Sequence, residues 1–286
     1  MPEIRIQLPK ENYSPGESVE GYVVVSSDDY FECNAIHLTL KGVESSKVVV
    51  SHGKYSTVYA EQNDFLDERV EFPVASGVQA GDTRHEFSFD LPKDVPNSYK
   101  GMHGVIEYYL VAQIERTMRR DPKEKIQLVV KGSSGESVTS EQHSDGLEDD
   151  GVLVLRGSVD DDVINRGDDF TLSFMLSGDP NIRGVRAEII SKEHVSPKGQ
   201  ERDWPVVLIK SQMPKEEIPI DTWVNVTLQT EADWPSPFRT SLIHYRYFLR
   251  LTLDVPWRFD KHLEIPLKIM PNVGIHDDLG GSGFTF

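Results

Sequence analysis

The chain has 286 residues, which suggests two domains, each long enough to close a hydrophobic core of its own. Thirty Lys and Arg stand against 47 Asp and Glu, and the formal net charge of −17 argues against nucleic acid as a partner. A single cysteine, Cys33, excludes an intramolecular disulfide and a thiolate metal cluster. The sequence shows neither a signal peptide nor an apolar run near the roughly 18 residues that span a bilayer, so we expect a cytoplasmic protein.

Apolar residues alternate with polar ones along the first 131 residues, whereas no stretch of similar length shows the 3.6-residue period of a helix. In chain order the apolar stripes are Ile4-Ile6-Leu8, Val19-Gly21-Val23-Val25, Ile36-Leu38-Leu40, Phe87-Phe89-Leu91, Ile106-Tyr108-Leu110-Ala112-Ile114 and Ile126-Leu128-Val130. Turn residues such as Pro15 and Gly16 separate them. This pattern predicts the strands of an antiparallel β-sandwich.

The second half repeats the pattern of the first. Gly167-Asp168 leads into a stripe as Gly16-Glu17 does, and the stripe at residues 106–114 matches the one at 243–251 at an offset of 137 residues. Residues 263–269 close the second half as residues 126–130 close the first. A repeat near half the chain length predicts duplicated domains, so we expect an all-β protein of two tandem immunoglobulin-like sandwiches.

Residues 132–151 separate the two halves and hold six acidic residues, no Lys or Arg, and many Ser and Gly. This composition predicts a flexible acidic linker. The predicted domains are therefore residues 1–131 and 152–270, with a flexible tail over residues 271–286.

Two segments of the first half resemble the arrestin family, in particular the α-arrestins and the arrestin-like subunit of retromer. Residues 13–21 read YSPGESVEG and residues 96–112 read PNSYKGMHGVIEYYLVA. The resemblance implies two sandwiches in the arrestin arrangement, with fold-determining roles for Pro15, Gly16, Glu20, Gly101, Gly104 and Tyr108.

The regulatory residues of signalling arrestins are less well matched. Their polar core pairs acids with an arginine on the last strand of the first domain, and Gln127 stands at the arginine position here, although Glu20 matches an acid. The first strand reads Ile4-Arg5-Ile6-Gln7 and lacks the paired lysines that sense receptor phosphates. No Pro-Pro-x-Tyr motif for ubiquitin-ligase recruitment is present. The resemblance thus implies an adaptor or scaffold, without naming its client.

The sequence offers no catalytic motif, so we expect no enzyme, no catalytic residues and no cofactor. The nine histidines form no zinc motif, and neither a nucleophile elbow nor a P-loop is present. Cys33 has no base or second cysteine nearby and is interpreted as a buried apolar residue. The Asp160-Asp161-Asp162 run and Asp168-Asp169 flank one loop; calcium binding there is conceivable, but a solvated loop is the simpler interpretation and we assign no metal site.

Two segments are candidates for binding partners. The basic run Arg116, Arg119, Arg120, Lys123 and Lys125 stands out on an acidic chain and suits an acidic or phosphorylated peptide or an anionic membrane surface. Phe284 and Phe286 end the flexible tail and are candidates to anchor it on the first domain or on a partner, the alternative being a frayed end.

The functional prediction is a non-catalytic adaptor in membrane-protein trafficking, endocytosis or signalling, which binds cytosolic tails of membrane cargo and is recruited to membranes. Two alternatives remain open. One is a bacterial or archaeal arrestin-like regulator of the sporulation-control type, acting in stress or development. The other is a carbohydrate-active sandwich, because Trp204, Trp223, Trp234 and Trp257 all lie in the second half and aromatic rings are typical sugar platforms.

Overall fold

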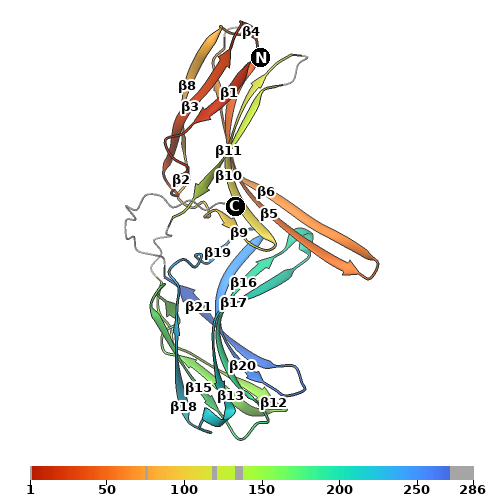
Figure 1. Ribbon diagram of the computed structural model, residues 1–286, viewed down its shortest axis with the longest axis vertical. Coiled ribbons are helices and arrows are strands. Elements are labelled where there is room, and N and C mark those ends of the chain that lie inside the picture. The colour runs from red at the N-terminus through yellow and green to blue at the C-terminus, as the bar shows by residue number, and fades with distance from the viewer. Residues whose placement is uncertain (1, 75–76, 118–120, 133–137, 271–286) are drawn as a thin grey trace. The chain divides into compact units, whose positions relative to one another are not determined.

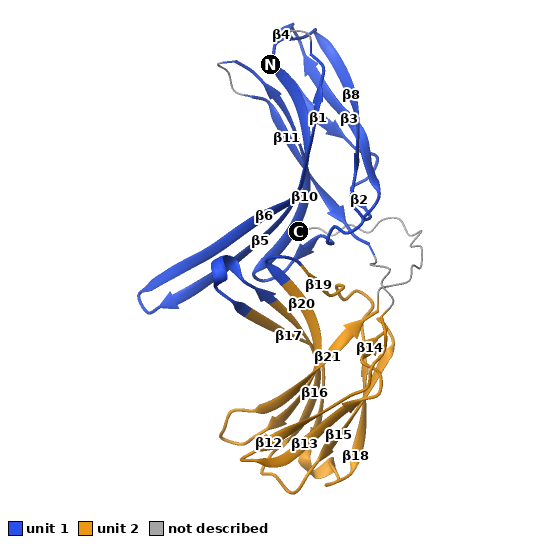
Figure 2. Ribbon diagram, turned by 180° about the vertical axis from the view of Figure 1, so that it is seen from behind, with its two compact units in different colours: residues 1–132, 194–202, 240–243 blue, residues 133–193, 203–239, 244–286 orange. Residues whose placement is uncertain are grey.

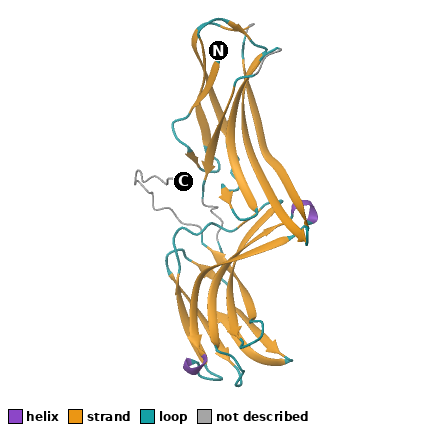
Figure 3. Cartoon of the chain, turned by 45° about the vertical axis from the view of Figure 1, so that its right-hand side comes forward, coloured by secondary structure: helices purple, strands orange, loops and turns teal. Residues whose placement is uncertain are grey.

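The computed structural model describes residues 2–74, 77–117, 121–132 and 138–270 (Figure 1). Within these ranges the regular structure is β, apart from two three-residue 3₁₀ helices, η1 (Pro197–Gly199) and η2 (Lys215–Glu217) (Figure 3). The predicted all-β sandwich class is confirmed.

The chain divides into two compact units, which Figure 2 distinguishes by colour. Unit 1 comprises residues 1–132 together with the short segments 194–202 and 240–243. Unit 2 comprises residues 133–193, 203–239 and 244–286. Two pieces of the second half of the sequence therefore belong to unit 1. The predicted first domain, residues 1–131, does not include them.

Unit 1 contains one sheet in the order β1-β3-β8, a larger one in the order β2-β11-β10-β5-β6 with β9 on β10, and the small pair β4-β7. The strands are β1 (Glu3–Gln7), β2 (Asn12–Tyr13), β3 (Ser18–Ser27), β4 (Phe31–Glu32), β5 (Ala35–His52), β6 (Tyr55–Phe72), β7 (Gly77–Val78), β8 (Gly81–Asp90), β9 (Tyr99–Lys100), β10 (Gly104–Glu115) and β11 (Lys123–Val130). The alternating stripes of β3, β5, β8, β10 and β11 supply its buried core.

Unit 2 contains sheets in the orders β12-β13-β15-β18 and β14-β21-β20-β16-β17, with β19 on β20. The strands are β12 (His143–Asp149), β13 (Val152–Val159), β14 (Val163–Ile164), β15 (Asp169–Leu176), β16 (Gly184–Val195), β17 (Arg202–Pro214), β18 (Trp223–Gln229), β19 (Phe238–Arg239), β20 (Ile243–Asp254) and β21 (Lys261–Ile269). Two packed sheets per unit give each unit the layered core of a sandwich.

Equivalent bonds in the two units show that they repeat one plan. The Tyr108 hydroxyl donates to the Pro96 carbonyl, and the Tyr247 hydroxyl donates to the Pro235 carbonyl. Tyr108 stands opposite Leu128 in its sheet, and Tyr247 stands opposite Leu267. The equivalent residues are thus 139 positions apart. The predicted offset of 137 for this stripe is wrong by two residues, a shift that period-two alternation cannot detect because it leaves every side chain on the same face.

The turn before β3 follows from its residue types. Pro15 and Gly16 lie between Ser14 and Glu17, whose amide donates to the Ser14 carbonyl at 3.0 Å, and Gly16 has φ of +82°. Proline at the second turn position and a positive φ at the third are typical of a type II turn, which favours glycine there.

The other residues of the family motif also have definite places in unit 1. The Gly101 amide donates to the Gly104 carbonyl at 2.8 Å, which closes the bend before β10. A Cβ on Gly104 would lie 2.7 Å from Cδ1 and 2.8 Å from Cγ1 of Ile243, so a side chain at this position would force Ile243 to shift. Glu20 is exposed on β3, opposite Ser88.

The segment predicted as a flexible linker is in part a strand. Residues 143–149 form β12, which pairs with β13 in antiparallel register from His143 opposite Val159 to Asp149 opposite Val152. The linker prediction is therefore wrong for these residues, which are part of a sheet of unit 2. Backbone pairing at the edge of a sheet does not require the apolar side chains on which the prediction relied.

Candidate partner-binding site

The basic run predicted to bind a partner lies at the turn between β10 and β11 of unit 1. Arg116 follows the end of β10, and Lys123 and Lys125 lie on β11. Arg119 and Arg120 lie outside the described residues. Three of the five predicted side chains can therefore be placed.

Arg116 and Lys125 do not share one place. The ammonium of Lys125 lies 3.6 Å from the centroid of the Tyr109 ring, whereas the guanidinium carbon of Arg116 lies 5.5 Å from that of Phe31. Lys125 stands opposite Val111, five residues before Arg116, a separation of about 17 Å along a strand. The basic run is therefore divided between a sheet face and the end of the unit.

Arg116 lines a pocket of about 600 Å³ at the end of unit 1. The pocket is bounded by Tyr30, Phe31, Glu32, Cys33 and Asn34 on one side and by Arg116 and Thr117 on the other. The Thr117 hydroxyl donates to the Asn34 side-chain oxygen at 3.1 Å, and the Asn34 amide donates to the Glu115 carbonyl at 2.9 Å. These bonds hold the segment before β5 against the end of β10, and so fix the shape of the pocket.

Cys33 is buried beside this pocket. Burial raises the pKa of the thiol, and the nearby charge of Arg116 offsets this only in part. A thiol with a raised pKa is mostly protonated at neutral pH and is a poor nucleophile. The interpretation of Cys33 as a buried apolar residue agrees with this position.

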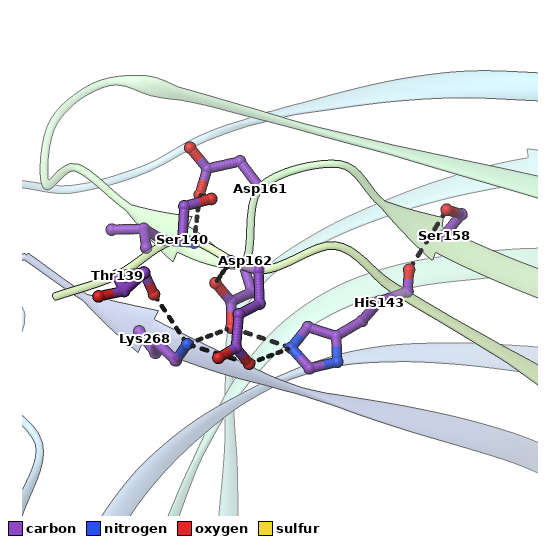
Figure 4. Close-up of polar contacts among 9 residues, drawn as sticks. Thr139, Ser140, His143, Ser158, Asp161, Asp162 and Lys268 are labelled. Atoms are coloured by element: carbon purple, nitrogen blue, oxygen red, sulfur yellow. Dashed lines mark hydrogen bonds and ion pairs between the residues drawn. The ribbon is translucent and has the colours of Figure 1, made fainter.

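The aspartates considered for calcium have separate partners in unit 2. Asp162 is buried, whereas Asp160 and Asp161 are exposed. Asp160 accepts a hydrogen bond from the Gln142 side chain at 3.1 Å. Asp161 accepts one from the Ser140 hydroxyl at 2.7 Å, which Figure 4 shows. The run Asp160–Asp162 thus holds the segment before β12 by several bonds.

Asp162 is the centre of a charged cluster with Glu141, His143 and Lys268. One Asp162 oxygen accepts from the Glu141 amide at 2.9 Å, and the other lies 3.0 Å from both His143 Nε2 and Lys268 Nζ (Figure 4). Burial raises the pKa of the Asp162 carboxyl, but these hydrogen bonds outweigh burial and hold its pKa below the usual value. The carboxylate is therefore ionised and compensated at neutral pH.

The same cluster has a composition that metal ions favour. One ligand atom each from Glu141, His143 and Asp162 lie within 4.8 Å of one another. Lys268 Nζ, however, lies 3.0 Å from Asp162 and 3.5 Å from Glu141, and the hydrogen bond to Asp162 raises the pKa of the lysine. A lysine ammonium already supplies the positive charge that these carboxylates need, so we interpret the cluster as an ion-pair network.

Glu44 is the residue that sequence analysis missed most completely. It lies on β5, is 1% exposed and accepts hydrogen bonds from the Ser241 hydroxyl, the Leu242 amide at 3.3 Å and the Asn63 side chain at 3.1 Å. The segment 240–243 belongs to unit 1, so this carboxylate fastens the segment within that unit. The sequence shows only a charged residue at the end of an apolar stripe, and two of its partners, Ser241 and Leu242, lie almost 200 residues later.

The tryptophans of unit 2 have different environments. Trp234 is 5% exposed and stacks on Tyr247 at a ring-centroid distance of 5.8 Å, as a core residue does. Trp257, in the turn between β20 and β21, is fully exposed together with Phe259. Trp234 is thus part of the packing and not a sugar platform, while the exposed turn is a surface feature that the sequence analysis did not identify.

The fold and these sites define a class of protein: two β-sandwich units that repeat one plan, with surface pockets and polar clusters. Residues 3–133 match the model of the family described as Arrestin (or S-antigen), N-terminal domain. The chain therefore carries an arrestin N-terminal domain over residues 3–133, and proteins of the arrestin family are generally non-enzymatic adaptors or scaffolds with protein partners. A comparison with curated proteins gives no match. In the part of the chain that the structure describes, no helix is long and apolar enough to cross a bilayer.

Proposed function

We propose that the protein is a non-catalytic cytoplasmic adaptor of the α-arrestin or retromer-subunit kind. It binds membrane-protein cargo or signalling partners and is recruited to membranes. The observation that carries this proposal is the match of residues 3–133 to the arrestin N-terminal domain. Because one fold hosts many functions, the client must be identified through its contacts.

A ribbon of unit 1 offers a surface for such a client. It is formed by residues 47–60, the distal parts of β5 and β6, and β10 pairs with β5 only as far as Ser46. Val49 and Val58 stand opposite each other and are 53% and 54% exposed, and Tyr55 is 80% exposed. Apolar side chains on a two-stranded ribbon whose strand β6 ends the order of its sheet suit pairing with an extended peptide.

Proximity labelling in the native host tests the adaptor proposal. We expect the wild-type chain to label membrane proteins or trafficking subunits above a background of labelling enzyme alone. The double variant Tyr55→Ser with Val58→Thr should lose part of that set, because it removes exposed apolar area without touching the core. Ser56→Thr, on the same ribbon, is the matched control and should label as wild type does. Labelling of soluble metabolic enzymes alone would contradict the proposal.

An aromatic turn of unit 2 supports the membrane part of the proposal. Trp257 and Phe259 are fully exposed, with Arg258 between them. Asp260, the acid of this turn, is 2.7 Å from the guanidinium of Arg186 and is thereby neutralised. Exposed aromatic rings beside an arginine are typical of a surface that enters the headgroup region of an anionic membrane.

The double variant Trp257→Ser with Phe259→Ser should weaken binding to vesicles that contain phosphatidylserine by about tenfold or more. Partial burial of each ring contributes about 1 kcal/mol, and 1.4 kcal/mol corresponds to tenfold in affinity. Vesicle flotation at several lipid concentrations measures this. Val206→Ser with Val207→Ser, which removes two half-exposed apolar side chains of β17, is the control and should bind as wild type does. Equal binding by all three chains would exclude this turn from membrane contact.

A further inference from the structure

The Arg116 side chain is partly desolvated where it lines the pocket. Its Nε is buried and has no hydrogen-bond partner among the described residues. Its guanidinium rests on the Phe31 ring and lines the pocket with Asn34 and Thr117. A desolvated donor of an ionised group costs free energy until an acceptor reaches it, so the pocket is suited to an anion.

The carboxylates of Glu115 and Asp121, which lie near Arg116 in sequence, are bonded to groups other than its guanidinium. The Asp121 carboxylate accepts from the backbone amide of Arg116 at 2.8 Å through one oxygen and from the Gln113 side chain at 3.1 Å through the other. The Glu115 carboxylate lies 3.2 Å from the Arg69 guanidinium. Among the residues that the structure describes, neither acid forms an ion pair with the Arg116 guanidinium, which lines the pocket.

The charges of the pocket indicate what kind of anion it takes. Arg116 is the cation that lines it, and the exposed Glu32 is an acid that lines it as well. Glu32 repels a dianionic phosphate more strongly than a monoanionic carboxylate, and the two oxygens of a carboxylate match the parallel donors of a guanidinium. The volume of about 600 Å³ also leaves room for an apolar side chain against Phe31 and Tyr30.

We propose that this pocket binds a carboxylate carried by a partner polypeptide, with Arg116 as its counter-ion. The carboxylate belongs to a free C-terminus or to an acidic side chain, and the residue that carries it packs on Phe31. This assignment rests on the proposed adaptor function, since it names the chemistry of the partner. It also gives the one described arginine of the predicted basic run a defined role.

NMR of the full chain, labelled with ¹⁵N and ¹³C in arginine, tests the proposal directly. The Nε–Hε signal of Arg116, assigned with an Arg116→Lys variant, should shift on titration with N-acetylphenylalanine. It should not shift with the corresponding amide, which lacks the charge, and inorganic phosphate should bind at least tenfold more weakly. The signal of Arg84, which is exposed on β8, is the control and should stay in place in all three titrations.

Peptides then distinguish the two sources of the carboxylate. Seven-residue peptides selected on the wild-type chain are compared with versions that carry an amidated C-terminus or Gln in place of each acid. The proposal expects one of these changes to weaken binding at least tenfold, and Arg116→Gln to do the same while Lys125→Gln has no effect. Equal shifts by acid and amide, tighter binding of phosphate, or peptide affinities unchanged in Arg116→Gln would overturn it.

The outcome for the pocket is separable from the outcome for the adaptor. Loss of the Arg116 response with membrane-protein labelling intact overturns the pocket and leaves the adaptor function standing. Carboxylate binding at Arg116 without any labelling of trafficking or membrane proteins overturns the adaptor function instead. The NMR comparison uses the wild-type chain, so it remains decisive even where a variant fails to fold.

Discussion

Replacing Glu44 with alanine should lower the free energy of unfolding of unit 1 by about 2 to 4 kcal/mol. The change leaves the Ser241 hydroxyl, the Leu242 amide and the Asn63 side chain without their shared acceptor and creates a small void in a place that is 1% exposed. Urea unfolding followed by far-UV circular dichroism measures the loss. Glu68→Ala, on the exposed part of the neighbouring β6, is the matched control and should change stability by less than about 0.5 kcal/mol.

The same carboxylate makes unit 1 sensitive to acid. Burial raises the pKa of Glu44, but the hydrogen bonds from Ser241, Thr240, Asn63 and the Leu242 amide outweigh it, so the pKa in the folded state lies below the usual value. A depressed pKa contributes stability that is complete above the unfolded pKa of about 4.3 and is lost as the pH falls through the folded pKa. The difference in stability between wild type and Glu44→Ala should therefore shrink as the pH falls below the unfolded pKa of about 4.3. A difference that stays constant over this range would show that Glu44 acts through packing and not through its charge.

Much of the fold was predictable because a strand with one buried face has apolar residues at every second position. The stripe from Ile106 to Ile114 predicts β10, and every second residue of that strand is buried. The repeat of the pattern predicted two sandwiches for the same reason. Alternation alone, however, left the sequence distance between equivalent residues of the two units uncertain by two residues, the period of a strand. The family resemblance rested on turns and bends, such as Pro15-Gly16, where the backbone restricts the residue type.

The strand β12 lacks this alternation, and so the sequence did not predict it. Its sequence, His143 to Asp149, contains one apolar residue and most of its side chains are exposed or only partly buried. It lies at the edge of its sheet, so its place depends on backbone hydrogen bonds to β13 and on the bonds that Asp160 and Asp162 make to the segment before it. Composition assigns such a segment to a linker because backbone pairing and long-range polar contacts leave no periodic signal.

The candidate sites were less predictable than the fold for a related reason. The basic run indicated Arg116 by its charge, but the pocket around it is formed by residues 30–34, more than 80 positions earlier. Glu44 depends on residues 240–242 in the same way. A charged side chain is interpreted from sequence as solvated, and only the fold reveals which ones are desolvated and paired.

Asp162→Ala should lower the free energy of unfolding of unit 2 by about 2 to 3 kcal/mol. The carboxylate is 1% exposed, and its removal leaves the Glu141 amide without an acceptor and the His143 and Lys268 side chains without their shared partner. Removal of one member of a buried ion pair costs about 3 to 5 kcal/mol, and the partial exposure of Lys268 reduces this through solvent screening. All four tryptophans of the chain lie in unit 2, so tryptophan fluorescence during urea unfolding reports on that unit selectively.

Two comparisons distinguish a buried ion pair from an exposed one and from a metal site. Asp160→Ala removes an exposed neighbour that bonds only to Gln142 among the described residues, and should cost less than about 0.5 kcal/mol. Zinc chloride should leave the midpoint of the wild-type transition unchanged, because the Lys268 ammonium already compensates Asp162 and Glu141. A metal-dependent rise of the midpoint that disappears in His143→Ala would show that the cluster is a metal site and that Lys268 yields its place to the ion. An unchanged midpoint, together with the loss of stability in Asp162→Ala, would show that this ion-pair network holds the start of β12 onto its sheet.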